Sequence, residues 1–555
     1  MNQEALTMEY RQLDRDIVLF EGYDRKEQDL VIETPLTQKD TMEQYEALCR
    51  RAREIEAPDP VYALLKNHFN DYLEAMRERV EAPYRNPASR LNGCTWGFSS
   101  LMRTDRRPLE ERFADFLLRA ENQRTIWATA QPFLKDTAQK DLIRWADGLS
   151  NTARDLRWIA EEVPDWFTPL GQDAVCKAQQ ALHDLADDML EWQAWTRETL
   201  ITEEAPVAEA VPDTEKIVQM EASEYGALLH DTLGVELDEL LSWYETEIEK
   251  TRAEVLKSAA RAIAISGVDE PLPTTVGAAN DLLWKYAGPC DSPEEMYARA
   301  KVYLARTRAL AHEFVDLPED EQCICLKVPS ELRESYPWGG YENGDVHQKP
   351  IVGQMFLNQY NYREITDGWI KMNAMHETYP GHHVQFVRGI TDPLPQTLKR
   401  GAKYIPLIEG TAHRTERAFE WIFGEDPWFP LFVSYRRHHT SVRIKADLML
   451  FYFGRPVEEA TQLYMDELGF ARHVARGQVQ SQINTPGYFT CYYYGMKKLC
   501  DWEAEFGYNK KDYTELLFSI GNMSMENVRR YLELSEAEKL RFRKDFPSLL
   551  MEEEA

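Results

Sequence analysis

Apolar side chains spaced three or four residues apart constrain the fold of this chain more than any other feature of its sequence. Residues 38–83, 108–163 and 172–202 repeat this spacing between charged residues, which is the pattern of an amphipathic helix. The same segments are rich in Ala, Leu, Glu, Lys and Arg, which favour helix, and they contain few turn signals. The sequence therefore predicts a mainly α-helical protein.

Two short stretches have the composition of β-strands. They are residues 323–328 and 351–358, which are apolar and bounded by turn residues. Between them, residues 337–340 and 342–345 carry the Gly, Pro, Asn and Asp that indicate loops. We expect a small sheet that includes residues 351–358 beside the helix of the candidate metal site. Within it, residues 355–358 are either an edge strand that pairs with an extended peptide or an ordinary core strand.

Residues 203–213 differ in composition from the helical segments on either side. The stretch EEAPVAEAVPD contains two prolines and four acidic residues, which is typical of a linker or an exposed loop. We therefore divide the chain into an N-terminal helical region, residues 1–213, and a second helical region, residues 214–555, which carries the candidate metal site. We expect the two regions to pack as one elongated unit around a cleft.

The charge balance limits the partners of the chain. Lys and Arg number 64 and Asp and Glu number 94, which gives a net charge of −30. Binding of nucleic acid or of an anionic membrane requires a basic surface, so we expect neither partner. The run Arg-Arg-His-His at residues 436–439 is interpreted as a solvated or groove-lining basic face. With no signal-peptide pattern, no long apolar run and no CxxC among eight cysteines, we expect a cytoplasmic protein.

Histidine residues gather in one part of the chain. Seven of the 12 lie between residues 376 and 473, and clusters of His with carboxylates indicate a metal site. Residues 371–390 are KMNAMHETYPGHHVQFVRGI, in which His376-Glu377 opens the pattern of a zinc-hydrolase helix. In the usual form, His-Glu-x-x-His, both histidines bind zinc from one helix face and the Glu activates water. Here Pro380 occupies the place of the second histidine, and His382 and His383 follow it.

Pro380 and Gly381 offer a way for a later histidine to reach the metal. On an unbroken helix His382 would point about 120° away from His376, and His383 would sit about 10.5 Å along the axis. Pro380 removes the amide that would bond to the carbonyl of His376, so the helix kinks or bulges there, and Gly381 permits unusual backbone conformations. Two residues looped out would place His382 where the second histidine usually lies. This argument favours His382, and His383 stays open as the alternative.

Glu409 is the candidate third ligand. It follows the apolar stretch 405–408, where a buried carboxylate needs a partner. A gluzincin-type site takes its third ligand from a Glu on a following helix, and metal ligation would supply that partner; a buried salt bridge or a helix cap is the alternative. His413 and Glu416 follow four and seven residues later on the same helix face, and we expect them to support the ligands.

The segments HETYPGHH and EGTAHRTE resemble the signature of the "domain of unknown function 885" family, which is a His-Glu-x-x-Pro-Gly-His-His stretch followed by a Glu-Gly-x-Ala helix. Residues 328–333, 443–447 and 486–495 are similar to further family segments in the same order. The resemblance covers roughly residues 225–500. The chain departs from the family pattern at Thr411, Phe451 and Tyr488, where the family has Trp, His and Gln. These departures concern substrate contacts and leave the proposed metal ligands untouched.

The resemblance implies a mainly helical, gluzincin-like zinc peptidase fold, similar to Taq-type carboxypeptidases, neurolysin and dipeptidyl peptidase III. In such a site His376, His382 and Glu409 would hold Zn²⁺. Glu377 would act as the general base. Tyr492 holds the family's Tyr position and is the expected oxyanion donor, with Tyr488 or Tyr493 as alternatives.

Three functions are compatible with these residues. The first is a zinc metallopeptidase, carboxypeptidase- or oligopeptidase-like, that cleaves a peptide substrate. The second is a zinc amidase or esterase that acts on a small non-peptide molecule. The third is a helical binding protein with a non-catalytic metal site, and the intact His376-Glu377 pair together with Glu409 counts against it.

Overall fold

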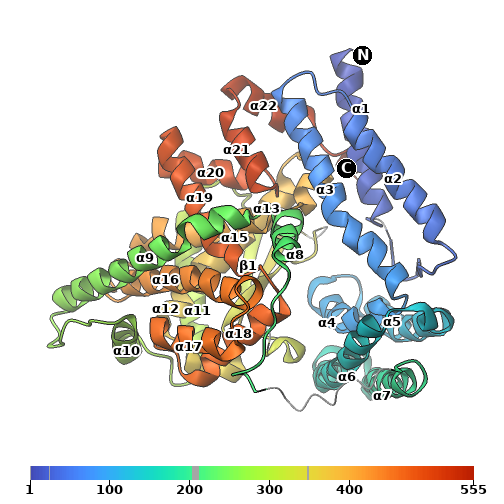
Figure 1. Cartoon of the computed structure of the whole chain (residues 1–555), viewed down its shortest axis with the longest axis horizontal. Helices are drawn as coiled ribbons and strands as arrows, with labels where there is room; N and C mark the ends of the chain where they lie inside the picture. The colour runs from blue at the N-terminus through green and yellow to red at the C-terminus, as the bar shows by residue number, and fades with distance from the viewer. Residues whose placement is uncertain (1, 24, 203–211, 335, 347–348, 555) are drawn as a thin grey trace.

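The computed structural model describes residues 2–23, 25–202, 212–334, 336–346 and 349–554. Helices make up most of the chain, and a sheet of three short strands lies among them (Figure 1). The prediction of a mainly helical fold with a small sheet is therefore confirmed. In the described part of the chain, no helix is both long enough and apolar enough to cross a bilayer.

The helices follow the amphipathic segments of the sequence and break where capping or turn residues occur. The segment 38–83 divides into two helices because the Asp59 side chain caps the second one, which opens with Pro60. Gly267, at φ +67°, ends the longest helix. In chain order the helices are α1 Gln3–Phe20, α2 Gln38–Glu54, α3 Pro60–Arg85, α4 Cys94–Thr104, α5 Leu109–Ala130, α6 Gln139–Phe167, α7 Gln172–Thr199, α8 Ala222–Ala227, α9 Leu237–Ser266, α10 Val276–Tyr286, α11 Pro293–Ala311, α12 Asp367–Asn373, α13 His382–Thr391, α14 Gln396–Arg400, α15 Ile405–Ala418, α16 Phe429–Asp447, α17 Val457–Leu468, α18 Arg472–Asn484, α19 Thr490–Phe506, α20 Lys510–Ser519, α21 Met525–Glu533, α22 Glu536–Asp545 and α23 Leu549–Glu554.

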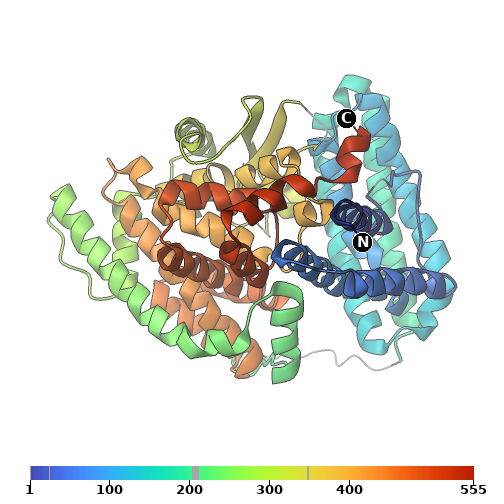
Figure 2. The same cartoon turned by 90° about the horizontal axis from the view of Figure 1, so that it is seen from above.

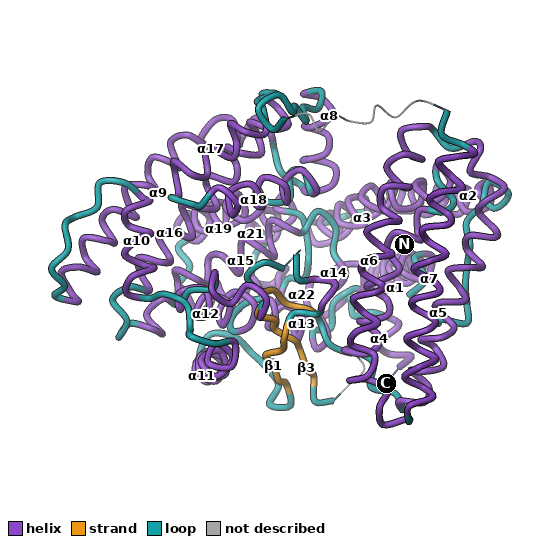
Figure 3. The backbone as a smooth tube through the Cα atoms, turned by 90° about the horizontal axis from the view of Figure 1, so that it is seen from below, coloured by secondary structure: helices purple, strands orange, loops and turns teal. Residues whose placement is uncertain are grey.

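The sheet consists of β1 Glu321–Lys327, β2 Gly339–Glu342 and β3 Ile351–Leu357, in the order β1-β3-β2. β3 pairs in parallel with β1 and antiparallel with β2, and α13 lies beside the sheet (Figure 3). All seven residues of β3 are buried. The two strands expected from the sequence are present. However, the interpretation of residues 355–358 as an edge strand is wrong, because β3 is the central strand and both its edges are paired.

Strand β2 lies in a segment where the sequence predicted only a loop, so that prediction was wrong. The glycines that indicated a loop are needed for another reason. A Cβ at Gly339 would lie 2.3 Å from the carbonyl oxygen of Phe356 on β3, so a larger residue could not come this close. Composition alone does not distinguish a glycine in a tight strand pair from a glycine in a loop.

Buried apolar side chains form two main cores. The larger one joins residues of α1–α3, such as Leu13 and Phe69, to residues from Tyr225 to Phe546. The smaller one lies within α4–α7, which form a bundle at one end of the molecule (Figures 1 and 2). The expected boundary at residue 213 does not separate these cores, because the first three helices share a core with the region after it. Residues 203–211 of the expected linker lie outside the described residues.

Polar contacts also join α1–α3 to the last third of the chain. The buried carboxylate of Asp14 on α1 accepts hydrogen bonds from the backbone N–H groups of Gln396 and Thr397, at 2.8 and 2.9 Å, at the start of α14. It thereby satisfies donors that a helix terminus leaves open. At the start of α3, Asp59 forms an ion pair with Arg541 of α22 at 2.5 Å.

Candidate metal centre

The segment that carries His376 and Glu377 is not a regular α-helix. α12 continues into a π-helical turn, Ala374–Thr378, in which the N–H of Tyr379 donates to the carbonyl of Ala374 at 3.3 Å. The helix then ends, because Pro380 has no N–H to continue it, and α13 begins at His382. The expected bulge within one continuous helix is therefore wrong. The structure has two helices joined by a tight turn, which nevertheless returns His382 toward His376.

Gly381 makes the tight turn possible. A Cβ on this residue would lie 2.0 Å from the carbonyl oxygen of His376 and 2.3 Å from that of Met375. Both contacts are far shorter than any allowed van der Waals distance, so only glycine fits without a shift of the backbone. The consequence is a close pair of imidazoles, with the ring centroids of His376 and His382 4.8 Å apart.

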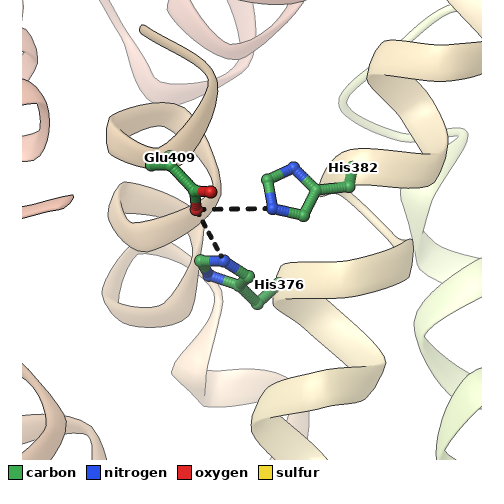
Figure 4. A group of neighbouring side chains, drawn as sticks. All are labelled: His376, His382 and Glu409. Atoms are coloured by element: carbon green, nitrogen blue, oxygen red, sulfur yellow. Dashed lines mark ion pairs between the residues drawn. The ribbon is translucent and has the colours of Figure 1, made fainter. Parts of the chain in front are cut away.

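Three predicted ligands come together around one carboxylate oxygen (Figure 4). The Nε2 atom of His376 lies 3.3 Å, and that of His382 3.5 Å, from Oε2 of Glu409. The ligand atoms of these three residues all lie within 4.8 Å of one another. Two imidazoles and one carboxylate are a donor set of catalytic zinc sites, so these residues fit the metal that the sequence suggested.

The position of Glu409 depends on the close packing of α15 against α19. A Cβ at Gly410 would lie 2.5 Å from the backbone of Gly495, and a Cβ at Gly495 would lie 1.8 Å from the carbonyl oxygen of Pro406. The two glycines therefore let the helix backbones touch. This contact brings Glu409 on α15 next to Tyr492 on α19.

The charges at the site favour a cation. Burial would raise the pKa of the Glu409 carboxyl, but its hydrogen bonds with His376 and His382 outweigh burial and hold that pKa well below its usual range. Burial would likewise lower the pKa of His376, yet the carboxylates of Glu409 and Glu416 raise it to about 10. Oε2 of Glu409 is buried, and the two imidazoles are the groups that lie within ion-pair distance of it among the described residues. The donor set thus attracts positive charge, which a proton or a metal cation can supply.

Glu416 supports His376 from behind, as expected from its place on the helix face. Its Oε1 lies 2.8 Å from Nδ1 of His376, and its Oε2 lies 3.0 Å from Nδ1 of His413. A carboxylate on Nδ1 keeps a proton there, so a metal cation that displaced the proton on Nε2 would meet a lone pair directed at the donor set. Nε2 of His413 in turn lies 2.8 Å from the hydroxyl of Thr440.

His383, the alternative ligand, lies in a separate buried cluster. Its Nε2 is 2.6 Å from Oε2 of Glu321, and its Nδ1 is 3.1 Å from the hydroxyl of Tyr341. Tyr379 donates a hydrogen bond to the same Glu321 carboxylate. This cluster ties the turn before α13 to the start of β1. Sequence reasoning missed Glu321, since an acid at the start of an apolar strand is the single local signal for it.

Glu377 and two tyrosines complete the surroundings of the donor set. Oε2 of Glu377 lies 4.0 Å from Nε2 of His382. The hydroxyl of Tyr488 donates to Oε1 of Glu409 at 2.7 Å and lies 3.2 Å from the hydroxyl of Tyr492. Burial, and then the charge of Glu409, raises the pKa of both tyrosines well above the usual value, so both hydroxyls stay protonated.

Tyr493 does not face the site, so this alternative to Tyr492 is wrong. Its hydroxyl donates to Oε2 of Glu247 on α9 at 2.6 Å. By contrast, the ring of Tyr492 stacks on that of His376, with an angle of 10° and a centroid distance of 6.1 Å. A shift of one residue along α19 turns the side chain to another face of the helix.

A cavity of about 650 Å³ opens beside the donor set. Its lining includes His382, Tyr341, Phe386 and Tyr404, as well as Tyr23 from the segment after α1. The volume is typical of sites for small organic ligands or short peptides. The cavity therefore reaches the donor set at His382, and a residue of the N-terminal segment, Tyr23, also lines it.

The run at residues 436–439 is not a solvated basic face, so this interpretation was wrong. His438 and His439 on α16 are fully buried, and Arg436 is 5% exposed. His438 lies 2.9 Å from the hydroxyl of Thr251, and His439 lies 3.2 Å from the side-chain oxygen of Gln478. Helix α16 is covered by α9 and α19, so these polar side chains lie inside the protein.

A family model described as "Bacterial protein of unknown function (DUF885)" matches residues 20–530. The chain belongs to this family. The match confirms the resemblance carried by HETYPGHH and EGTAHRTE, and it extends over α2–α7, where the sequence offered little support.

The fold of this DUF885 chain is shared with solved structures. Proteins from Colwellia psychrerythraea and Shewanella oneidensis, each described as a "putative lipoprotein", match it with TM-scores of 0.69 and 0.68 at 15% and 16% identity. The matches cover 95% and 96% of this chain and 99% of each of the other two chains. At this level of identity the likeness shows the fold alone. The comparison with curated proteins found no match.

Proposed function

We propose that this DUF885 protein is a zinc-dependent hydrolase, specifically a metallopeptidase with a gluzincin-like centre that cleaves amide bonds. The observation that carries the proposal is the convergence of His376, His382 and Glu409, whose ligand atoms lie within 4.8 Å of one another. The buried Oε2 of Glu409 supports it, because both imidazoles lie within ion-pair distance of this atom, and a cation shared by all three would be well placed there.

Each neighbouring side chain has a role in this chemistry. A zinc ion held at the site would polarise the substrate carbonyl and lower the pKa of water. Glu377 is outside the three-residue set but adjacent to it, so its carboxylate can accept a proton from the attacking water and pass it to the leaving amine. The protonated hydroxyl of Tyr492 can donate to the oxyanion of the substrate. Glu416 keeps His376 oriented.

The cavity beside His382 supports a peptide or small amide as substrate. Its volume of about 650 Å³ accommodates a few residues. The presence of Glu377 argues against a purely structural metal site, because such a site has no use for a free carboxylate next to its ligands.

The proposal is tested by metal content and by a substrate screen. Purified protein should contain about one zinc per chain, and His376→Ala, His382→Ala and Glu409→Ala should each lose it. His473→Ala, which alters an exposed histidine on α18, is the matched control. A screen with peptides blocked at either end should then find zinc-dependent hydrolysis. Full zinc retention in all three variants, or no hydrolysis by the zinc-loaded protein, would contradict the proposal.

A further inference from the structure

Two arginines of α16 lie against the candidate centre. The guanidinium carbon of Arg436 is 5.5 Å, and that of Arg443 5.4 Å, from the centroid of the Tyr492 ring. The same ring stacks on His376. Both arginines therefore lie within one aromatic side chain of the donor set.

Both guanidinium groups are buried and incompletely paired. Arg436 is 5% and Arg443 4% exposed. Nε and Nη1 of Arg436 and Nε of Arg443 are buried without a hydrogen-bond partner among the described residues. Nη2 of Arg443 donates to the neutral side-chain oxygen of Gln478 at 3.0 Å. Nε of Arg436 lies 3.8 Å from Oε1 of Glu416, which is an ion-pair distance but too long for a hydrogen bond.

Another buried arginine of the same protein shows what full pairing looks like. Arg414 on α15 is 2% exposed, and Glu503 accepts hydrogen bonds from its Nε and Nη2 at 2.9 and 2.7 Å. In the part of the chain that the structure describes, Arg443 has no carboxylate within ion-pair distance. Gln478 and the rings of Phe489 and Tyr492 meet the guanidinium of Arg443 without neutralising its charge, so an anion from outside the chain would stabilise it.

The electrostatics point in the same direction. Burial first, and then the positive charge of Arg436, lowers the pKa of Arg443 to about 10. Both effects would be offset by a bound anion between the two side chains. A carboxylate is the anion that fits a guanidinium best, since its two oxygens match two parallel N–H groups.

We propose that Arg436 and Arg443 bind the free C-terminal carboxylate of a peptide, which makes this protein a carboxypeptidase. The inference rests on the proposed metallopeptidase function and specifies its substrate class. Oε1 of Glu416 contacts Nδ1 of His376 at 2.8 Å and lies 3.8 Å from Nε of Arg436, which places Arg436 close to the donor set. Arg443 is linked to it through the ring of Tyr492. An extended peptide advances about 3.3–3.6 Å per residue. A carboxylate held by these arginines therefore suits removal of a terminal residue better than cleavage deep inside a chain.

The first test compares matched substrates. The probes are N-acetyl-Ala-Ala-X peptides, with X each of the twenty amino acids, as free acids and as C-terminal amides. The wild-type protein should cleave the best acid with a kcat/KM about 10²-fold above that of its amide, as expected for loss of a charge-assisted hydrogen bond. Arg443→Gln should remove most of this preference by lowering kcat/KM for the acid, with the value for the amide nearly unchanged. Arg443→Lys should be intermediate, because it keeps the charge but not the planar pair of donors.

Arg437→Gln is the matched control. Arg437 is on the same helix but contacts Sδ of Met496 instead of Tyr492, so its loss should leave the preference intact. Equal cleavage of acids and amides by the wild-type protein would overturn the inference, as would an equal fall for both substrates in Arg443→Gln. If X is Asp or Glu and the protein strongly prefers the C-terminal amide to the C-terminal free acid, it recognises the carboxylate of the side chain X. That result would also overturn the inference.

Binding separates this inference from the proposed function. Glu377→Gln protein is titrated by calorimetry with the same acids and amides, which requires no turnover. Tighter binding of acids, lost in the double variant with Arg443→Gln, would support the carboxylate site even if no hydrolysis were found in any protein. Equal binding of acids and amides would overturn the inference while leaving zinc-dependent hydrolysis possible.

Discussion

Replacing Gly381 by alanine would place a methyl group 2.0 Å from the carbonyl oxygen of His376 and 2.3 Å from that of Met375. The predicted effect is the steric conflict of this methyl group with the two carbonyl oxygens. Neither carbonyl can rotate away, because both belong to the backbone of the helical segment that carries His376. We expect a loss of about 3 kcal/mol in the free energy of unfolding, at the upper end of overpacking effects. The turn must open, and His382 must move away from Glu409.

The assay measures stability and metal affinity separately. Urea unfolding in the presence of a chelator gives the stability change without metal, and chelator competition gives the zinc affinity, which should fall at least about 10²-fold because a ligand is displaced. Gly389→Ala is the control, since a Cβ at this α13 position meets no atom within 4 Å and should stabilise the helix by about 0.5–1 kcal/mol. If Gly381→Ala keeps both its stability and its zinc affinity, the account of this turn is refuted.

Three further predictions address the chemistry and the pH dependence. Glu377→Gln should retain zinc and the fold but reduce kcat about 10³-fold or more, measured with a substrate from the peptide screen; near wild-type turnover would exclude Glu377 as the base. Tyr492→Phe should reduce kcat about 10²-fold with little change in KM, because the contact strengthens in the transition state; a change confined to KM would argue for ground-state binding instead. Burial lowers the pKa of His68 on α3 to about 4. Below about pH 6.5 the unfolded chain therefore binds a proton at this residue that the folded chain does not bind. As a result, folding stability falls as pH decreases from 6.5 toward 4. His68→Leu should weaken this fall by about 3 kcal/mol over that range in urea unfolding at several pH values; an unchanged pH dependence would show that His68 is protonated in the folded state.

The helical fold was predictable because it depends on local sequence. Apolar spacing and helix propensity act over a few turns, and they located α2, α3 and α5–α7. Strand β2 was missed because its glycines are needed for close contacts with β3. A local sequence pattern does not reveal such contacts between two segments. A distortion near Gly381 was expected because of Pro380. The residues Pro380-Gly381 are compatible both with a bulge within one helix and with a break between two helices, so the sequence alone did not predict the break that the structure has.

The candidate site was predictable only where its residues lie in short, recognisable motifs. His376, His382 and Glu409 belong to two short segments with recognisable spacing, and the structure brings them together. Glu321 pairs with His383 across 62 residues, and no local pattern connects them. Arg436 and its neighbours suggested an exposed face because charged residues are usually exposed. Their burial depends on α9 and α19, which cover α16 and come from elsewhere in the chain.

The shared core of α1 with the end of the chain has a consequence for synthesis on the ribosome. Asp14 and its partner Gln396 are 382 residues apart, which corresponds to roughly 40 s at about 10 residues per second. During this interval α4–α7 can complete their own core, whereas α1 can pack only against α2 and α3 and lacks its contacts with α14 and α23. Helix α1 therefore completes its packing late, although it is made well before α14 and α23. In a nascent chain the part of α1 that contacts α14 and α23 stays uncovered until these helices are made, and chaperones can bind it during that time.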